Sequence, residues 1–252
     1  MTQTLEGHTV HRYDGELLHL HMLLLEMGGL VLDQLRNALH ALSSKDLACA
    51  LKVIDRDNDV DSLEVQTDRE VLNIIARRTP VARDLRTVMV CSKAVTDLER
   101  AGDEASRIAK LSLPLLEGNG PDPSDNLLRD VCSMGRLSTN MLENSLTAMD
   151  RLDISLAEEL AASQPELDAE FQSSLRRLAT FIMEDSRNVG HAIRVVLIIK
   201  ALERIGQHAT NIAEQLIYLI RGEDVRHRRG QSRSADDRAD SAGEADLRDT
   251  KD

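Results

Sequence analysis

Apolar residues recur at helical spacing along most of the 252-residue chain, with polar residues on the intervening positions. This pattern predicts six long helices, over residues 16–42, 46–78, 81–111, 125–149, 154–183 and 188–221. Thr79-Pro80 is typical of a helix start, with Thr79 as the cap. Pro165 predicts a kink or break in the fifth helix, and Gly222 is typical of a helix end. The prolines and glycines of residues 112–125 predict a linker.

An internal repeat divides the predicted helices into two sets of three. Residues 98–109 recur as residues 202–213, with seven of the twelve paired positions identical. Short connections make neighbouring helices antiparallel, so each half is predicted to be an up-down-up three-helix bundle. We therefore expect a flexible lead-in, a first repeat, a linker, a second repeat and a disordered charged tail, at residues 1–15, 16–116, 117–124, 125–222 and 223–252.

Composition agrees with an all-α fold and restricts the kinds of partner. Only 2% of the residues are aromatic and five are proline. The net charge of -12 argues against a nucleic-acid-binding surface, which needs a cationic excess. The same acidity fits a protein with affinity for cations.

The cysteines and the amino-terminal helix indicate a cytosolic protein. Cys49, Cys91 and Cys132 are odd in number and isolated, which favours reduced core residues over a disulfide framework. Acidic residues before the first apolar run do not fit a signal peptide. The run 17–32 is interrupted by histidine, glutamate and glycine, and we interpret it as too short to span a bilayer.

Two groups of acidic residues in the first half are candidates for a metal-binding site. The second predicted helix carries four acids at helical spacing on one side, namely Asp57, Asp61, Glu64 and Asp68. The third carries Glu99 and Asp103 four residues apart. If the two antiparallel helices bring these groups together, they form an oxygen-rich pocket suited to magnesium, calcium, manganese or iron. The alternative is a solvated acidic face, because the sequence does not give the axial register.

Enzyme signatures are scarce. The chain has no phosphate-binding glycine loop and no nucleophile motif. A di-iron oxidase needs two Glu-x-x-His helices, and only Glu16 and His19 have that spacing. A carboxylate-bridged metalloenzyme that uses the acids of the first bundle remains the alternative function.

Several short motifs occur in a fixed order along the chain. They are Leu-Glu-Arg-x-Gly-(Asp/Gln) at 98–103 and 202–207, Met-Gly-Gly at 27–29, Ala-Arg-Asp-Leu-Arg at 82–86, Met-Glu-Asp-Ser-Arg at 183–187 and Asn-Ile at 211–212 leading to Arg-Gly at 221–222. Together they resemble the PhoU family of phosphate-uptake and phosphate-signalling regulators. The resemblance implies two three-helix bundles related by a pseudo-two-fold axis. It also implies a non-enzymatic, cytoplasmic and often homodimeric protein that represses the phosphate-starvation response and restrains uptake. The implied partners are the ATPase subunit of a phosphate ABC transporter and a phosphate-sensing histidine kinase, with the membrane reached only through them.

The resemblance further implies one metal site in each bundle, built from paired (Glu/Asp)-x-x-x-Asp motifs. In the first bundle these are Asp57, Asp61, Glu99 and Asp103. When Ala148 and Asp153 are aligned with Ala41 and Asp46, the second set is Gln164, Asp168, Glu203 and Gln207. The implied cofactor is a divalent or trivalent metal ion (Mg, Mn, Fe or Zn). Each second-bundle motif has an amide in place of one carboxylate, which lowers ligand charge. We expect an intact first site and a weak, vacant or altered second one.

Overall fold

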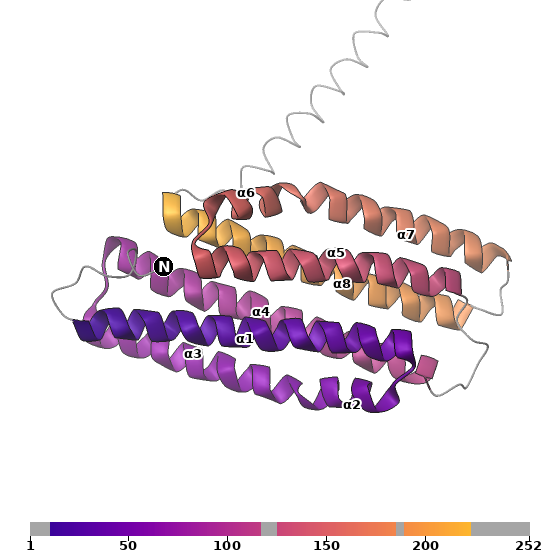
Figure 1. Ribbon diagram of the computed structural model, residues 1–252, viewed down its shortest axis with the longest axis horizontal. Coiled ribbons are helices and arrows are strands. Elements are labelled where there is room, and N and C mark those ends of the chain that lie inside the picture. The colour runs from indigo at the N-terminus through magenta and orange to yellow at the C-terminus, as the bar shows by residue number, and fades with distance from the viewer. Residues whose placement is uncertain (1–10, 117–124, 185–188, 223–252) are drawn as a thin grey trace, which may run out of the picture.

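The computed structural model describes residues 11–116, 125–184 and 189–222, and every regular element in these ranges is an α-helix (Figure 1). The helices are α1 (His11–Ser44), α2 (Leu47–Asp55), α3 (Asp57–Arg78), α4 (Ala82–Leu116), α5 (Asp125–Arg151), α6 (Ile154–Ala162), α7 (Gln164–Glu184) and α8 (Val189–Arg221). The all-α prediction is confirmed. The predicted linker at 117–124 and the predicted disordered tail at 223–252 lie outside the described residues.

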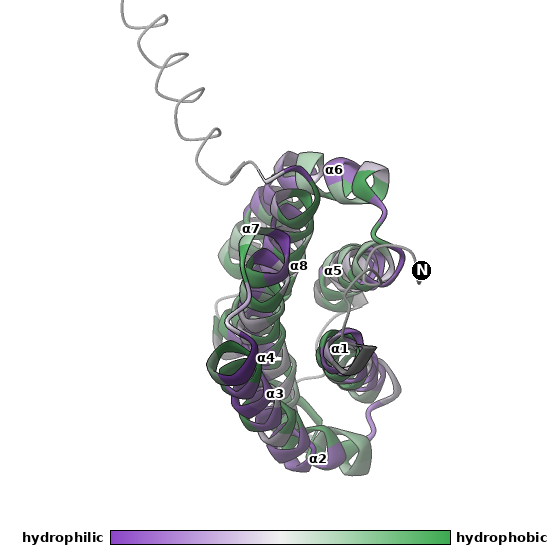
Figure 2. Cartoon of the chain, turned by 90° about the vertical axis from the view of Figure 1, so that its left-hand side faces the viewer, coloured by the Kyte–Doolittle hydropathy of each residue, from purple (hydrophilic) through white to green (hydrophobic). Residues whose placement is uncertain are grey.

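Two three-helix bundles lie side by side. The first consists of α1, the α2–α3 pair and α4, and the second of α5, the α6–α7 pair and α8. Viewed from the end, α3, α4, α8 and α7 form one row and α1 and α5 lie on the other side of the core (Figure 2). The long central helices α4 and α8 pack against each other, as do α1 and α5, so the two bundles share one apolar core.

The second and fifth predicted helices are each two helices. The first break is at Arg56, and Asp57 begins α3. The second is at Ser163, with Pro165 in the first turn of α7 as the sequence predicted. The break at Arg56 corrects the prediction of one continuous helix over 46–78. The sequence Asp57-Asn58-Asp59 explains it, because these side chains compete with helical hydrogen bonds and favour helix starts.

Several helix ends also differ from prediction. Helix α4 continues to Leu116 with Pro114 in its last turns, because Leu115 is buried and its neighbours pack on the core. Thr79 is the left-handed carboxy-terminal cap of α3, at φ 46°, and not the cap of α4. Helix α1 begins at His11, so residues 11–15 are helical rather than part of a flexible lead-in. Gly222, at φ +75°, ends α8 as predicted.

Helix α1 also corrects the reading of the amino-terminal apolar run. Within the described residues, one helical stretch, Tyr13–Ser44, is long and apolar enough to cross a membrane by length and composition, with a mean hydropathy of 1.3 over its most apolar 18 residues. The interrupting polar residues therefore do not exclude a span on these criteria. In the fold this helix packs against α2, α3, α4 and α5, and its apolar face belongs to the shared core.

Glycine contacts show the pseudo-two-fold relation between the halves. A Cβ on Gly28 of α1 would lie 2.3 Å from Leu146 of α5, and a Cβ on Gly135 of α5 would lie 2.8 Å from Leu39 of α1. Each glycine and each leucine is 107 residues from its counterpart. Helices α1 and α5 therefore approach each other closely at two equivalent points, and Gly28 of the Met-Gly-Gly motif serves helix packing.

The three cysteines are free, and their burial differs. Cys91 is buried and Cys49 is partly buried, whereas Cys132 is exposed. The prediction that all three are core residues is therefore wrong for Cys132, which lies on a groove between helices instead of on the core side of α5.

Candidate functional site

The acids predicted for the first bundle come together across α3 and α4. Asp57 and Asp61 lie in the first turns of α3, and Glu99 and Asp103 lie on the adjacent stretch of α4. Asp57 is within electrostatic reach of Asp61 and Asp103. Glu99 in turn interacts with Asp61 and Asp103. The axial register of the two antiparallel helices thus brings the Asp57/Asp61 motif of α3 next to the Glu99/Asp103 motif of α4.

Partial burial makes this acidic cluster costly when all its members are charged. Burial, followed by repulsion from Asp103, Glu64 and Asp61, raises the pKa of Glu99 to about 6. The pKa of Asp57 is raised chiefly by burial, with Ser106 and Lys110 partly offsetting the effect. The pKa of Glu64 is raised by burial and by Asp68. A bound cation would stabilise the charged forms of all these groups.

Two buried polar side chains beneath the acids lack partners. Ser106 of α4 is fully buried, and its hydroxyl, although close enough to lower the pKa of Asp57, makes no hydrogen bond of good geometry. Gln34 of α1 is 2% exposed and neither atom of its amide is hydrogen-bonded. Leaving such groups unpaired costs about 1–3 kcal/mol each. The Ser106 hydroxyl, the Gln34 amide oxygen and the carboxylates of the acidic cluster together are the kind of oxygen ligands that fit a hard cation.

The side chains are nevertheless spread apart as they stand. In the part of the chain that the structure describes, no three Asp, Glu, His or Cys side chains converge on one point as metal ligands. Mutual repulsion between carboxylates is a sufficient reason for such spreading. The residue types and their register fit a metal site, and metal binding itself stays a prediction.

The equivalent residues of the second bundle are paired with one another. Gln164 donates a hydrogen bond from Nε2 to Asp168 Oδ1 at 2.9 Å, and Gln207 donates from Nε2 to Glu203 Oε1 at 2.9 Å. Lys200 donates to the other oxygen of Glu203. Each amide therefore donates a hydrogen bond to the neighbouring carboxylate, which a bound cation would otherwise stabilise in the first bundle. The sequence alignment that identified this set is supported by the matching breaks before Asp57 and Gln164.

Between the bundles lies a buried polar network that the sequence did not predict. Asp97 of α4 is 6% exposed and is surrounded by three side chains of α8. Its Oδ1 lies 2.9 Å from His208 Nδ1 and accepts a hydrogen bond from Asn211, and its Oδ2 accepts one from Gln215 at 2.8 Å. His208 therefore faces the first bundle and is not directed at the second candidate metal site. The only sign of this network in the sequence is that Asp97 lies between apolar core positions of the third predicted helix.

An ion pair crosses the same interface. Glu104 of α4, also buried, forms a 2.6 Å ion pair with Arg204 of α8. Arg107 lies 3.8 Å from the other oxygen of Glu104. Together with the Asp97 network, this pair fixes the relative positions of the two bundles and hence of the two sets of site residues.

Comparison with known proteins identifies the family. The PhoU family, described as the PhoU domain, matches residues 24–112 and 131–216, one match in each bundle. A phosphate-specific transport system accessory protein PhoU homolog from Pseudomonas putida is 40% identical over 225 residues, covering 89% of this chain and 87% of that protein. The phosphate-specific transport system accessory protein PhoU of Escherichia coli is 35% identical over 223 residues, covering 88% and 91%.

Solved structures agree with the sequence relatives. The crystal structure of PhoU from Pseudomonas aeruginosa superposes with a TM-score of 0.80 at 38% sequence identity, covering 84% of this chain and 100% of that chain. PhoU from Streptococcus pneumoniae, described as a phosphate transport system regulatory protein, gives a TM-score of 0.76 at 30% identity, covering 84% and 99%. With a matching domain in both halves and the same fold, this chain belongs to the PhoU family.

Proposed function

We propose that this protein is a negative regulator of the phosphate-starvation response that also modulates phosphate uptake. The observation that carries the proposal is similarity over 84–89% of the chain, in sequence and fold, to accessory and regulatory proteins of phosphate transport. The protein acts in the cytoplasm as an adaptor between the ATPase subunit of a phosphate ABC transporter and a phosphate-sensing histidine kinase. It reaches the membrane through these partners.

The shape of the molecule supports an adaptor. The long helices give each bundle extended faces, and some of these faces carry exposed apolar residues. Leu85 and Met89 are 40% and 41% exposed and lie four residues apart on one face of α4, and Val81, which directly precedes the helix, is 72% exposed. An apolar stripe of this kind is suited to protein contacts, including a homodimer interface.

The acids of the first bundle bind a divalent or trivalent metal ion in this proposal. Asp57, Asp61, Glu99 and Asp103 supply oxygen ligands, and the raised pKa of Glu99 is the electrostatic support for the assignment. Gln164, Asp168, Glu203 and Gln207 form a weak site or none, because their hydrogen bonds already satisfy them. Metal occupancy then orders the first bundle without taking part in chemical turnover.

Binding to the transporter tests the adaptor directly. The full-length protein should be retained by the immobilised phosphate-transporter ATPase subunit, and a variant with Leu85→Asp and Met89→Asp should be retained less. A control with Ile193→Asp, an exposed apolar position of the second bundle, should behave as wild type. No retention of the wild-type protein by either the ATPase subunit or the histidine kinase would contradict the adaptor proposal.

A further inference from the structure

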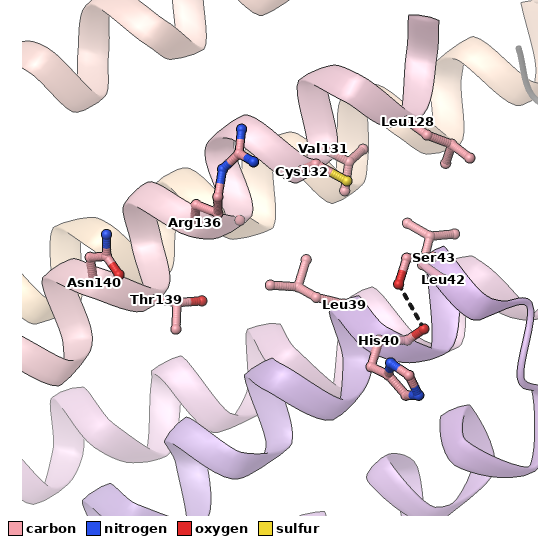
Figure 3. A pocket seen from close by; sticks show the side chains of 11 residues that line it. Leu39, His40, Leu42, Ser43, Leu128, Val131, Cys132, Arg136, Thr139 and Asn140 are labelled. Atoms are coloured by element: carbon pink, nitrogen blue, oxygen red, sulfur yellow. Dashed lines mark hydrogen bonds between the residues drawn. The ribbon is translucent and has the colours of Figure 1, made fainter. Parts of the chain in front are cut away.

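A pocket of about 520 Å³ lies between the carboxy-terminal half of α1 and the amino-terminal half of α5 (Figure 3). Leu39 and Leu42 line it from α1, and Leu128 and Val131 line it from α5. The pocket is lined from α1 and α5, and none of its lining residues belongs to α3 or α4, which carry the acidic residues. Its volume is within the range of small-molecule sites in proteins, about 300–1,000 Å³.

The pseudo-two-fold relation explains how the pocket arises. Three of the positions on α5 that line it correspond, 107 residues earlier, to positions on α1 that carry larger apolar side chains. The pairs are Leu24 with Val131, Leu25 with Cys132, and Leu32 with Thr139. In α1 the leucines at 24 and 32 are buried, at 0% and 8% exposure. Shortening each of these side chains on α5 leaves volume that the protein does not fill.

One buried polar group at the pocket is also unpaired. The Thr139 hydroxyl is buried yet has no hydrogen-bond partner, and Figure 3 shows it directed toward Leu39. A buried hydroxyl without a partner is costly, so a ligand that bonds to it would gain affinity. Leu32, the residue of α1 equivalent to Thr139, has no polar side-chain group that needs a hydrogen-bond partner.

The charge of the lining is opposite to that of the whole protein. The lining includes Arg136 and His40 and no acidic residue, in a chain of net charge -12. Within the described ranges, Arg136 forms no ion pair. A guanidinium at the rim of an apolar pocket selects a ligand with a negative group and an apolar body.

We propose that the α1–α5 pocket is a binding site for a small amphipathic anion, whose apolar part lies between the leucines while its acidic group meets Arg136. The Thr139 hydroxyl supplies a hydrogen bond inside the pocket. The site is separate from the acidic cluster and does not depend on the proposed regulatory function. Because the pocket bridges α1 of one bundle and α5 of the other, occupancy stabilises their packing.

Two fluorescent dyes that differ by one sulfonate test both parts of the proposal. The anionic dye is 1-anilinonaphthalene-8-sulfonate, and the neutral one is N-phenyl-1-naphthylamine. Titrated into the full-length protein, the anionic dye should bind more tightly. Arg136→Gln should weaken its binding roughly fivefold while changing binding of the neutral dye less than about twofold. Equal effects on both dyes, or none on either, would overturn the assignment of an anion.

Filling the pocket tests its location. The double variant Cys132→Leu and Thr139→Leu restores the side chains of the equivalent α1 positions and should weaken binding of both dyes at least tenfold. Asn144→Leu adds apolar volume to the exposed face of α5 outside the pocket and serves as the control. A thermal melt confirms that each variant is folded. Unchanged dye binding in the folded double variant would overturn the site.

Cysteine reactivity gives a readout in the unmodified sequence. Cys132 lines the pocket and is exposed, whereas Cys91 is buried away from it. Saturating anionic dye should slow alkylation of Cys132 by iodoacetamide and leave Cys91 unchanged, as followed by mass spectrometry. Unslowed alkylation of Cys132, or protection that depends on protein concentration and so on a second copy, would contradict a small-molecule site.

Discussion

Gln207 donates a hydrogen bond to Glu203 at 2.9 Å in the second bundle, where the first bundle has Asp103 beside Glu99. The exchange of one carboxylate for an amide thus turns a pair of mutually repelling carboxylates into a hydrogen-bonded pair. The same exchange is repeated on the partner helices, where Gln164 bonds to Asp168 while Asp57 lies near Asp61. The two halves share a fold, and we predict that they differ in their affinity for cations.

Metal binding should therefore depend on the first bundle alone. Titrating Mn²⁺ into the metal-free protein by calorimetry should show binding that Glu99→Gln with Asp103→Asn weakens at least about tenfold, because two charged ligands are lost. The matched change in the second bundle, Glu203→Gln, should leave it unaltered. Binding that survives the first pair of changes but not the second would reverse the assignment.

The converse substitution should create a second site. Replacing Gln164 and Gln207 with aspartate restores the acids at the positions equivalent to Asp57 and Asp103 and removes both amide donors. We expect additional bound Mn²⁺ per chain by elemental analysis after dialysis. Unchanged metal content in a folded protein would show that the acids alone do not define the site.

The pH dependence of stability should carry the signature of Glu99. Its pKa is about 6 in the folded protein against 4.5 in the unfolded chain, so the folded state holds its proton more tightly. The metal-free protein should lose stability as pH rises from about 4.5 through 6, by at most about 2 kcal/mol before solvent screening is considered. Urea unfolding of wild type and Glu99→Gln measures this, and the variant should have the flatter profile. Equal slopes would contradict the raised pKa.

The close approach of α1 and α5 should make Gly28 intolerant of large residues. Gly28→Ile should destabilise by about 1–3 kcal/mol, since even its Cβ would lie 2.3 Å from Leu146. Neighbouring Gly29 has nothing within 4 Å of the same position, so Gly29→Ile should be neutral or slightly stabilising. Denaturant midpoints of the two variants should differ accordingly, and equal losses would argue against the packing.

The interface between the bundles should depend on Asp97. Replacing it with alanine leaves the side chains of His208, Asn211 and Gln215 without their acceptor. We expect a loss of about 2–4 kcal/mol in the free energy of unfolding. Asp33→Ala, at an exposed position of α1, should cost less than about 0.5 kcal/mol. A loss at Asp97 no larger than this control would show that the network is not stabilising.

Local features of the fold were predictable because their signals lie close together in sequence. Apolar periodicity gave the long helices, Pro165 marked the break before α7, and Gly222 marked the end of α8. The break at Arg56 was missed, because the apolar stripe continues on both sides of it and outweighed the helix-start signal of Asp57-Asn58-Asp59. The extent of α4 past Pro114 depends on burial of Leu115, which only the folded core provides.

The site was predictable where two motifs lie on adjacent helices of one repeat. Asp61 and Glu99 come together because α3 and α4 are joined by a short turn, so the four-residue spacing of each motif was enough to suggest a cluster. Asp97 and His208 are 111 residues apart and belong to different repeats. Their contact depends on how the bundles pack, which helical periodicity does not specify. The unpaired Gln34 amide was likewise a product of packing.

Reporter expression in a deletion strain tests the proposed regulation most directly. A phosphate-starvation reporter should be repressed in high phosphate when the gene is present and derepressed when it is deleted, and the wild-type gene should restore repression. The account predicts only partial restoration by the variant with Glu99→Gln and Asp103→Asn. Repression that persists unchanged in the deletion strain would contradict a role as negative regulator of the phosphate-starvation response.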